Sequence, residues 1–229
     1  MASMLGATAI VLVGDLNEET ALAHLETVFG DVPVADLPAA PVLELKERDS
    51  VVELDFEFAQ AQLGYVVSAP PLSDPDSWAW RLLLYILSHG YEGRLGKEAI
   101  TRQGLVYYID SSYDSDGTNG RVTLQIGVDP QKLEAMRSLM EEMLRGLRAS
   151  PPTDTEIAEA KQHLLGRRQS AAQSNQEIST AMAREWHAQG RLLSIDEFEA
   201  TIDAVTRAEV LEIIPDFIAG GIVEVRARQ

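Results

Sequence analysis

The chain of 229 residues contains no cysteine, which removes disulfide bonds and thiolate metal sites from consideration. Basic residues are scarce: 19 Lys and Arg stand against 36 Asp and Glu, a formal net charge of −17. Such an acidic chain repels phosphate backbones, so we expect no nucleic-acid partner. No apolar run approaches the roughly 20 residues of a membrane helix, so we expect a soluble protein with no membrane partner.

Recognisable catalytic motifs are also absent. The sequence has no HExxH or HxxEH pair, no GxSxG elbow, no P-loop and no GxGxxG. A hydrolytic zinc site needs two histidines and a carboxylate that converge. The four histidines have no such partners at helical spacing, so we expect no catalytic residues and no metal ligands; they are His24, His89, His163 and His187.

A hydrophobic content of 45 % indicates a normal globular core. At the beginning of the chain, Ala9 to Val13 is apolar and β-branched, which predicts a buried strand. Asn17 then caps a predicted helix, and Gly30 ends it. We expect the chain to be a fragment of a longer protein, or a subunit, that begins inside a domain.

Pro33 to Pro41 is rich in proline and alanine and predicts an extended linker. We therefore divide the chain into a strand–helix unit at 1–34, a linker at 35–49 and an α+β domain at 50–229.

The first strand of that domain is predicted from an alternation of apolar and acidic residues. Leu54, Phe56 and Phe58 alternate with acidic positions at Glu53, Asp55 and Glu57. The acidic side is either an ordinary solvated face or an acidic wall of a peptide chamber, and the solvated face is the commoner arrangement in antiparallel sheets.

Further elements follow from periodicity and capping. Strands are predicted at Ala61–Val67, Leu105–Ile109, Val122–Val128 and Ile222–Ala227. The helix that begins near Asp76 is apolar nearly all round, which is typical of a helix buried between layers. Capping boxes predict three later helix starts, at Thr153–Glu156, Ser194–Glu197 and Thr206–Glu209. Pro215 and Gly220 are expected to end the helical run.

Runs of strands separated from runs of helices indicate an α+β fold with an antiparallel sheet covered by a helical layer. The Asp- and Asn-rich segment Tyr113–Gly120 predicts a hairpin loop. It lacks the twelve-residue ladder of an EF-hand, so we interpret it as a plain loop without calcium.

The most informative stretch is GRLGKEAITRQGLVY, from Gly93 to Tyr107. Its first part predicts a short helix over Arg94–Gln103 that ends at Gly104, where a strand follows at once. A helix that ends at glycine and leads directly into a strand presents the early strand residues at an edge or cleft, and Tyr107 and Tyr108 lie there. Taken without context, it is a common structural join that implies no function.

The same stretch resembles the zinc-free, C-terminal half of the M16 metallopeptidases, the family of insulinase, pitrilysin and the processing peptidases. The shared pattern is RL-x-x-E followed by GL-x-Y, carried by Arg94-Leu95, Glu98 and Gly104-Leu105-x-Tyr107. The string VGDLNEETALAHLETVFGDVP resembles the unit that closes the preceding M16 domain. The resemblance implies a LuxS/MPP-like half-fold, with zinc held only by HxxEH in a partner half.

One position departs from the family pattern. The family carries an arginine seven residues before the GL-x-Y tyrosine, and Ile100 stands there in this chain. The resemblance implies that this arginine and Tyr107 hold the substrate backbone against the zinc site. Arg102 is nearly opposite Ile100 on a helix, at about 100° per residue, and is the candidate replacement. The candidate substrate-binding residues are therefore Tyr107 and Arg102.

We interpret the chain as the zinc-free half of an M16-like peptidase or peptidase homologue. It would form part of a peptide-binding chamber wall, and its expected partners are peptides and a zinc-bearing or degenerate M16 half or subunit. A non-catalytic scaffold subunit of the same fold is the alternative, and an unrelated α+β binding module is a third hypothesis. The resemblance leaves the compartment open between a bacterial-type cytoplasm and periplasm.

Overall fold

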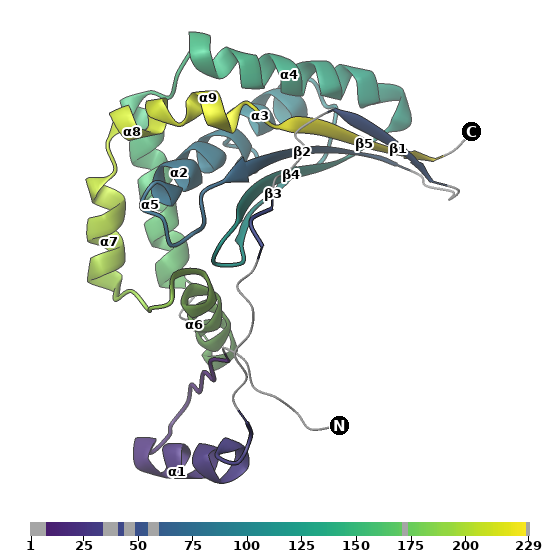
Figure 1. Cartoon of the computed structure of the whole chain (residues 1–229). Coiled ribbons are helices and arrows are strands. Elements are labelled where there is room, and N and C mark those ends of the chain that lie inside the picture. Colours follow the sequence, from purple (N-terminus) through teal and green to yellow (C-terminus); the bar gives the residue numbers. More distant parts are fainter. Residues whose placement is uncertain (1–7, 34–40, 44–48, 55–59, 171–173, 228–229) are drawn as a thin grey trace.

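The computed structural model describes residues 8–33, 41–43, 49–54, 60–170 and 174–227. Five strands form one sheet in the order β1-β5-β2-β4-β3 (Figure 1). Their bounds are β1 Ser50–Leu54, β2 Ala61–Ala69, β3 Asp110–Ser115, β4 Gly120–Val128 and β5 Gly221–Ala227. The pairs β2–β4, β2–β5 and β3–β4 are antiparallel, whereas the edge pair β1–β5 is parallel.

Helices make up most of the remaining described chain. Their bounds are α1 Glu18–Phe29, α2 Ser77–Ser88, α3 Arg94–Gly96, α4 Leu133–Ala149, α5 Asp154–Ser170, α6 Asn175–Gln189, α7 Ile195–Ala204, α8 Arg207–Glu212 and α9 Ile214–Phe217. A π-helical segment, η1, covers Lys97–Arg102, and a short 3-10 turn, η2, covers Pro130–Lys132. The predicted capping boxes at Ser194–Glu197 and Thr206–Glu209 form as expected, and Asn17 caps α1.

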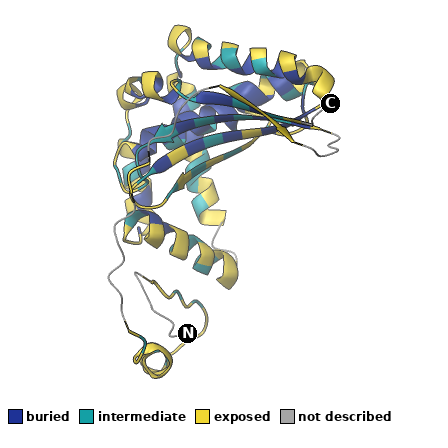
Figure 2. Ribbon diagram, turned by 45° about the vertical axis from the view of Figure 1, so that its right-hand side comes forward, coloured by how far each residue is buried: buried dark blue, intermediate teal, exposed yellow. Residues whose placement is uncertain are grey.

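Helices gather on one side of the sheet, and the strands are buried on that side (Figures 1 and 2). Along β2, the residues Ala61, Leu63, Tyr65 and Val67 are buried, and the residues between them are partly exposed. The helix α2 lies within this layer and is buried over almost its whole length. The predicted α+β fold, with a mostly antiparallel sheet under a helical layer, is therefore confirmed.

One charged network joins the helical layer to the sheet. The buried carboxylate of Glu224 on β5 accepts hydrogen bonds from Arg226 and from Arg137 on α4, whose Nη1 lies 2.7 Å away. Arg137 Nη2 also donates to Asp49 Oδ2 at 2.6 Å. Because a buried carboxylate is costly without such partners, this network fixes the position of α4 against β5.

The N-terminal unit stands apart from this body, below α6 (Figure 1). The predicted strand at Ala9–Val13 is wrong: the segment has no strand pairing, and the side chain of Ile10 is 44 % exposed. A strand exists through hydrogen bonds to a neighbour, and none of the described strands pairs with this segment. The division of the chain at residues 34 and 49 stays a prediction.

The segment Pro41–Leu43 is attached to the β3–β4 hairpin by the amide of Asn119. Its Oδ1 accepts from the Leu43 backbone N–H at 2.7 Å, and its Nδ2 donates to the Pro41 carbonyl at 3.1 Å. This contact places these three residues of the predicted linker beside the hairpin.

Three details differ from the prediction. The strand expected at Leu105–Ile109 is wrong: none of these residues is in a strand, and β3 begins only at Asp110. Because β3 runs to Ser115, the hairpin loop is shorter than Tyr113–Gly120. Register with β4 decides this boundary, because Asp110 is the first residue with a partner. Pro215 lies in the first turn of α9, directly after Ile214, where a missing N–H is tolerated, and does not end the helical run.

The edge strand β1 is exposed at every position. Its register with β5 places Glu53 beside Arg226, on the helix-covered side, and Val52 beside Val225, on the opposite side. Glu53 therefore does not contribute to an acidic wall on the uncovered side of the sheet. The other residues of the alternating pattern, Asp55, Phe56, Glu57 and Phe58, lie outside the described residues. In the described part of the chain, no helix is long and apolar enough to cross a membrane.

Candidate functional site

The sheet has one side that no described helix covers, and we call it the open face (Figures 1 and 2). Strand alternation and register place on it Gln62, Gly64, Val66 and Ser68 of β2, Asp110, Ser112 and Asp114 of β3, Arg121, Thr123, Gln125 and Gly127 of β4, and Val223 and Val225 of β5. The open face is polar over β3 and β4 and apolar over β5. Such a surface offers both hydrogen-bonding and apolar contacts to a ligand.

The stretch Gly93–Tyr107 leads from the helical layer to the end of the open face. Gly96 is required there, because a Cβ at this position would lie 1.6 Å from the carbonyl oxygen of Gly90. The predicted helix is present but winds as a π-helix from Lys97 to Arg102. Gly104 follows with a φ of +59°, a conformation that glycine adopts without strain. The chain then reaches Tyr107 in a segment without regular secondary structure.

Arg94, the arginine of the RL pair, has a structural role. Its Nε and Nη2 bind the two carboxylate oxygens of Glu156 at 2.6 and 2.7 Å. Its Nη1 donates to the Ser150 carbonyl at 2.6 Å. Hydrogen bonding from Arg94 lowers the pKa of Glu156 to about 2. Arg94 thus ties the stretch to the turn between α4 and α5.

Ile100 and Arg102 have the opposite environments expected from their helical spacing. Ile100 is partly buried and packs against the main core. Arg102 is exposed, and its Nη1 binds Glu98 Oε2 at 2.9 Å. Hydrogen bonds from Gln103 and then from Arg102 lower the pKa of Glu98. Arg102 is therefore engaged by the Glu98 of the same motif and stays a candidate for substrate contact.

Tyr107 and Tyr108 both reach solvent, with 85 % and 54 % of their surfaces exposed. Tyr108 lies against the open face, since a Cβ on Gly127 would be 3.2 Å from its hydroxyl and 2.9 Å from Gln60 Oε1. Of the two tyrosines, the sequence pattern nominated only Tyr107 for substrate contact. Tyr108 was missed because the motif marks only one tyrosine, although the pair of adjacent aromatics is visible in the sequence.

Two of the four histidines lie side by side. His89, the C-cap of α2, and His163 of α5 have ring centroids 4.1 Å apart, and both stack on Tyr85. Burial lowers the pKa of each imidazole. Across the described residues, no three His, Asp or Glu side chains come close enough to hold a metal ion. Within this part of the chain, the pair of His89 and His163 therefore has no carboxylate that completes a two-histidine, one-carboxylate zinc centre.

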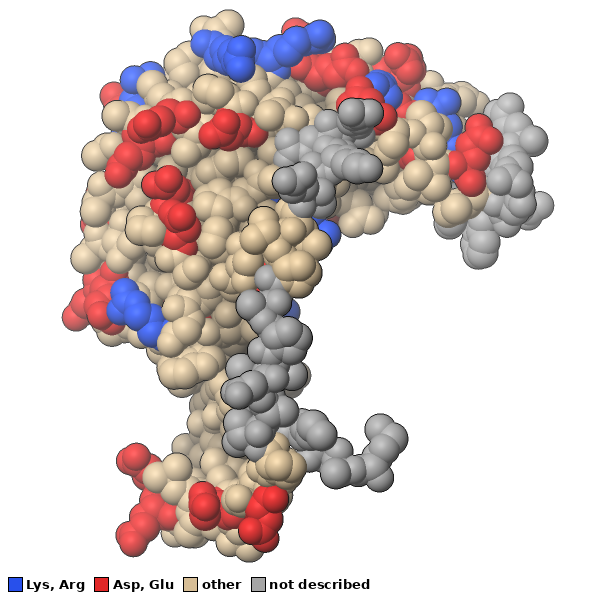
Figure 3. Space-filling view, viewed as in Figure 1, with Lys and Arg blue, Asp and Glu red and all other residues tan. Residues whose placement is uncertain are grey.

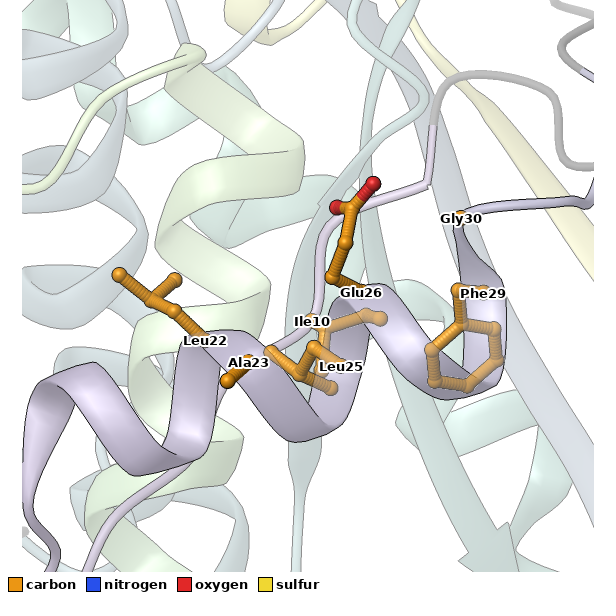
Figure 4. Close-up of a pocket in the computed structure, with 7 residues that line it drawn as sticks. All are labelled: Ile10, Leu22, Ala23, Leu25, Glu26, Phe29 and Gly30. Atoms are coloured by element: carbon orange, nitrogen blue, oxygen red, sulfur yellow. The ribbon is translucent and has the colours of Figure 1, made fainter.

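The helix α1 carries an unburied apolar side. A groove of about 460 Å³ beside it is drawn in Figure 4 and is lined by Ile10, Leu22, Ala23, Leu25, Glu26, Phe29 and Gly30. No residue of α1 is buried. In the view of Figure 3, the charged side chains on this unit are acidic. This exposed apolar surface is a candidate contact for another polypeptide.

Solved structures similar to this chain share its fold. One is the peptidase M16 inactive domain from Pseudomonas fluorescens, with 22 % identity, a TM-score of 0.76, and 93 % of this chain and 52 % of that chain covered. A second is a protease from Helicobacter pylori, with 16 % identity, a TM-score of 0.75, and 93 % of this chain and 54 % of that chain covered.

A third is complex III2 from Candida albicans, with Inz-5 bound, at 14 % identity and a TM-score of 0.75. The match to this third structure covers 92 % of the present chain and 52 % of the other chain. The chain thus spans about half the length of these structures. No curated protein matches its sequence. The family model of the peptidase M16 inactive domain matches residues 6–164, and the chain therefore belongs to the peptidase M16 inactive-domain family.

Proposed function

We propose that this chain forms one wall of a peptide-binding chamber and supplies no catalytic centre of its own. The observation that carries the proposal is the open face, which stays free of described helices while the opposite face is buried. Tyr107 and Tyr108 lie in the segment just before β3, where an extended peptide crossing the open face would meet them. Arg102 is the candidate cation of the motif and would assist Tyr107 in holding the peptide backbone.

The proposed partner is a second M16 half or subunit, zinc-bearing or degenerate. Two observations support this partner: the chain spans about half of the similar structures, and α1 exposes an apolar groove without a described cover. A partner half that packs against α1 would bury Leu22, Leu25 and Phe29. The buried apolar surface would stabilise the pair at about 25 cal/mol per Å².

The proposed zinc belongs to that partner. We expect no stoichiometric zinc in this chain alone, because the described residues offer no converging set of ligands. Elemental analysis after dialysis checks this expectation. One tightly held zinc ion per chain would contradict it.

A scaffold subunit without proteolytic activity is the second candidate, and Ile100 favours it. Its position matches the family arginine, yet its side chain is apolar and packs against the core. One charge-assisted hydrogen bond to substrate would then be missing, a loss of about 1.5–3 kcal/mol. That loss lowers a rate by about 10- to 100-fold.

The two candidates are separated by reconstitution with a zinc-bearing M16 half and a peptide-hydrolysis assay. For the chamber wall, Tyr107→Phe is expected to reduce hydrolysis, and Ile100→Arg to raise it by about 10-fold or more. If the chain is instead a scaffold subunit, neither the unchanged chain nor any of these variants is expected to hydrolyse peptide in the reconstituted pair. Chelator-insensitive hydrolysis by the purified chain alone would refute both candidates.

Arg102→Ala completes the test. No change with this variant, together with a gain from Ile100→Arg, supports Ile100 as the position of the family arginine. A large loss with Arg102→Ala and no gain from Ile100→Arg would show that Arg102 already makes the substrate contact.

A further inference from the structure

Four arginines line one cleft on the helix-covered side of this acidic protein. The cleft has a volume of about 400 Å³ and lies where α2, α5, α6, α7 and β3 meet. Its basic residues are Arg81 of α2, Arg167 and Arg168 of α5, and Arg184 of α6. The whole chain has 19 basic residues against 36 acidic ones, so a cluster of this kind runs against the overall charge.

Carboxylates in the described part of the chain neutralise only one of these four cations. Arg168 Nη2 binds Glu185 Oε2 at 2.8 Å and also donates to the Leu193 carbonyl at 2.7 Å. Within the described residues, no ion pair joins Arg81, Arg167 or Arg184 to an acidic side chain. The lining therefore contains four guanidinium groups and one carboxylate, that of Glu185, and its net charge is +3.

Arg81 is the most desolvated of the unpaired arginines. Its guanidinium lies 4.1 Å from the ring centroid of Trp78, and burial lowers the pKa of Arg81 to about 10. The group is still charged at neutral pH. Glu185 attracts Arg81 from a distance, but its direct ion pair is with Arg168. A partly buried charge without a carboxylate in direct contact is costly, which favours a bound anion as its counter-ion.

Other groups of the cleft do not supply that counter-ion. Burial raises the pKa of Tyr113, so its phenol is neutral, and its hydroxyl donates to the Pro70 carbonyl at 2.6 Å. Asp74 and Asp76 lie near enough to act on Tyr113, but neither forms an ion pair with Arg81 in the described structure.

We propose that this cleft binds a multiply charged, phosphate-bearing small molecule. Guanidinium groups present planar donor forks that match phosphate oxygens, and three net positive charges suit a polyanion better than a single carboxylate. Phe198, Ala181 and Ala188 form an apolar wall that suits the organic part of such a ligand. Since Tyr113 alternates with Ser112 and Asp114 of the open face, the cleft lies on the other side of the sheet from the proposed peptide wall.

The probe for this site is inorganic pyrophosphate, with citrate as a polyanion that lacks phosphate. Calorimetric titration of the 229-residue chain at low salt, roughly 50 mM, is expected to show one saturable pyrophosphate site and weaker citrate binding. The double variant Arg167→Gln/Arg184→Gln removes two exposed cleft cations. It is expected to weaken pyrophosphate binding by about tenfold or more.

The matched control is Arg145→Gln/Arg148→Gln, which removes two exposed charges from α4 and leaves the cleft intact. Its pyrophosphate affinity is expected to stay within about twofold of the unchanged chain. The proposal is overturned if pyrophosphate gives no saturable binding, if both double variants lose affinity equally, or if citrate binds as tightly as pyrophosphate.

Discussion

Replacing Glu156 by glutamine removes the carboxylate that holds Arg94 against the α4–α5 turn. Glutamine keeps the size of the side chain and an oxygen that accepts from the Thr153 N–H, which Glu156 Oε2 receives at 2.9 Å. The cap of α5 is therefore retained, and the change isolates the charge. The two short hydrogen bonds from Arg94, at 2.6 and 2.7 Å, lose their charged acceptor. In glutamine, one acceptor becomes a neutral amide oxygen and the other becomes an NH₂ group, which cannot accept from Arg94.

The pKa of Glu156 sets the magnitude. Hydrogen bonding from Arg94 lowers it from 4.5 to about 2. At about 1.4 kcal/mol for each unit of pKa, this difference corresponds to about 3 kcal/mol of stability. The Glu156 side chain is 27 % exposed, so solvent screening reduces the expected contribution to about 2 kcal/mol. Because the folded pKa is the lower one, this stability is complete above about pH 5 and is lost as the pH falls toward 2.

Urea unfolding at pH 7 and pH 3 measures the effect. At pH 7, Glu156→Gln is expected to lower the free energy of unfolding by about 2 kcal/mol, and at pH 3 by less than about 1 kcal/mol. The exposed Glu142 of α4 provides the control, since Glu142→Gln makes the same change in charge without an Arg partner. A loss below about 0.5 kcal/mol at pH 7, or an equal loss at both pH values, would refute the reasoning.

Two further substitutions test the fold. Tyr65→Phe removes a buried hydroxyl that bonds to two backbone groups and is expected to cost about 1–3 kcal/mol in urea unfolding, whereas the exposed Tyr107→Phe should cost nothing measurable. Gly96→Ala should destabilise the chain by at least about 2 kcal/mol, because its Cβ has no room; Gly146→Ala, within α4 and without a close neighbour, should be neutral or stabilising by up to about 1 kcal/mol. If the two tyrosine variants unfolded at the same urea concentration, or the two glycine variants did so, the packing described here would be contradicted.

Local sequence signals determined much of this protein. The capping residues at Asn17, Ser194 and Thr206 start helices where they were expected, because a cap acts on the backbone within three residues. The apolar periodicity of α2 predicted its burial, since a helix apolar on all sides has no surface for water. The motif around Tyr107 indicated the M16 inactive-domain family, and the family model confirms this.

Only the tertiary structure decided features that depend on partners far away in the chain. β3 begins at Asp110 and not at Leu105 because pairing with β4 sets its boundary, and Ala9–Val13 forms no strand because no described strand lies beside it. The cleft joins Arg81 to Arg184, which lie on different helices with no common sequence pattern. Local propensity acts over a few neighbouring residues, whereas strand pairing and charge clustering depend on how the chain folds back on itself.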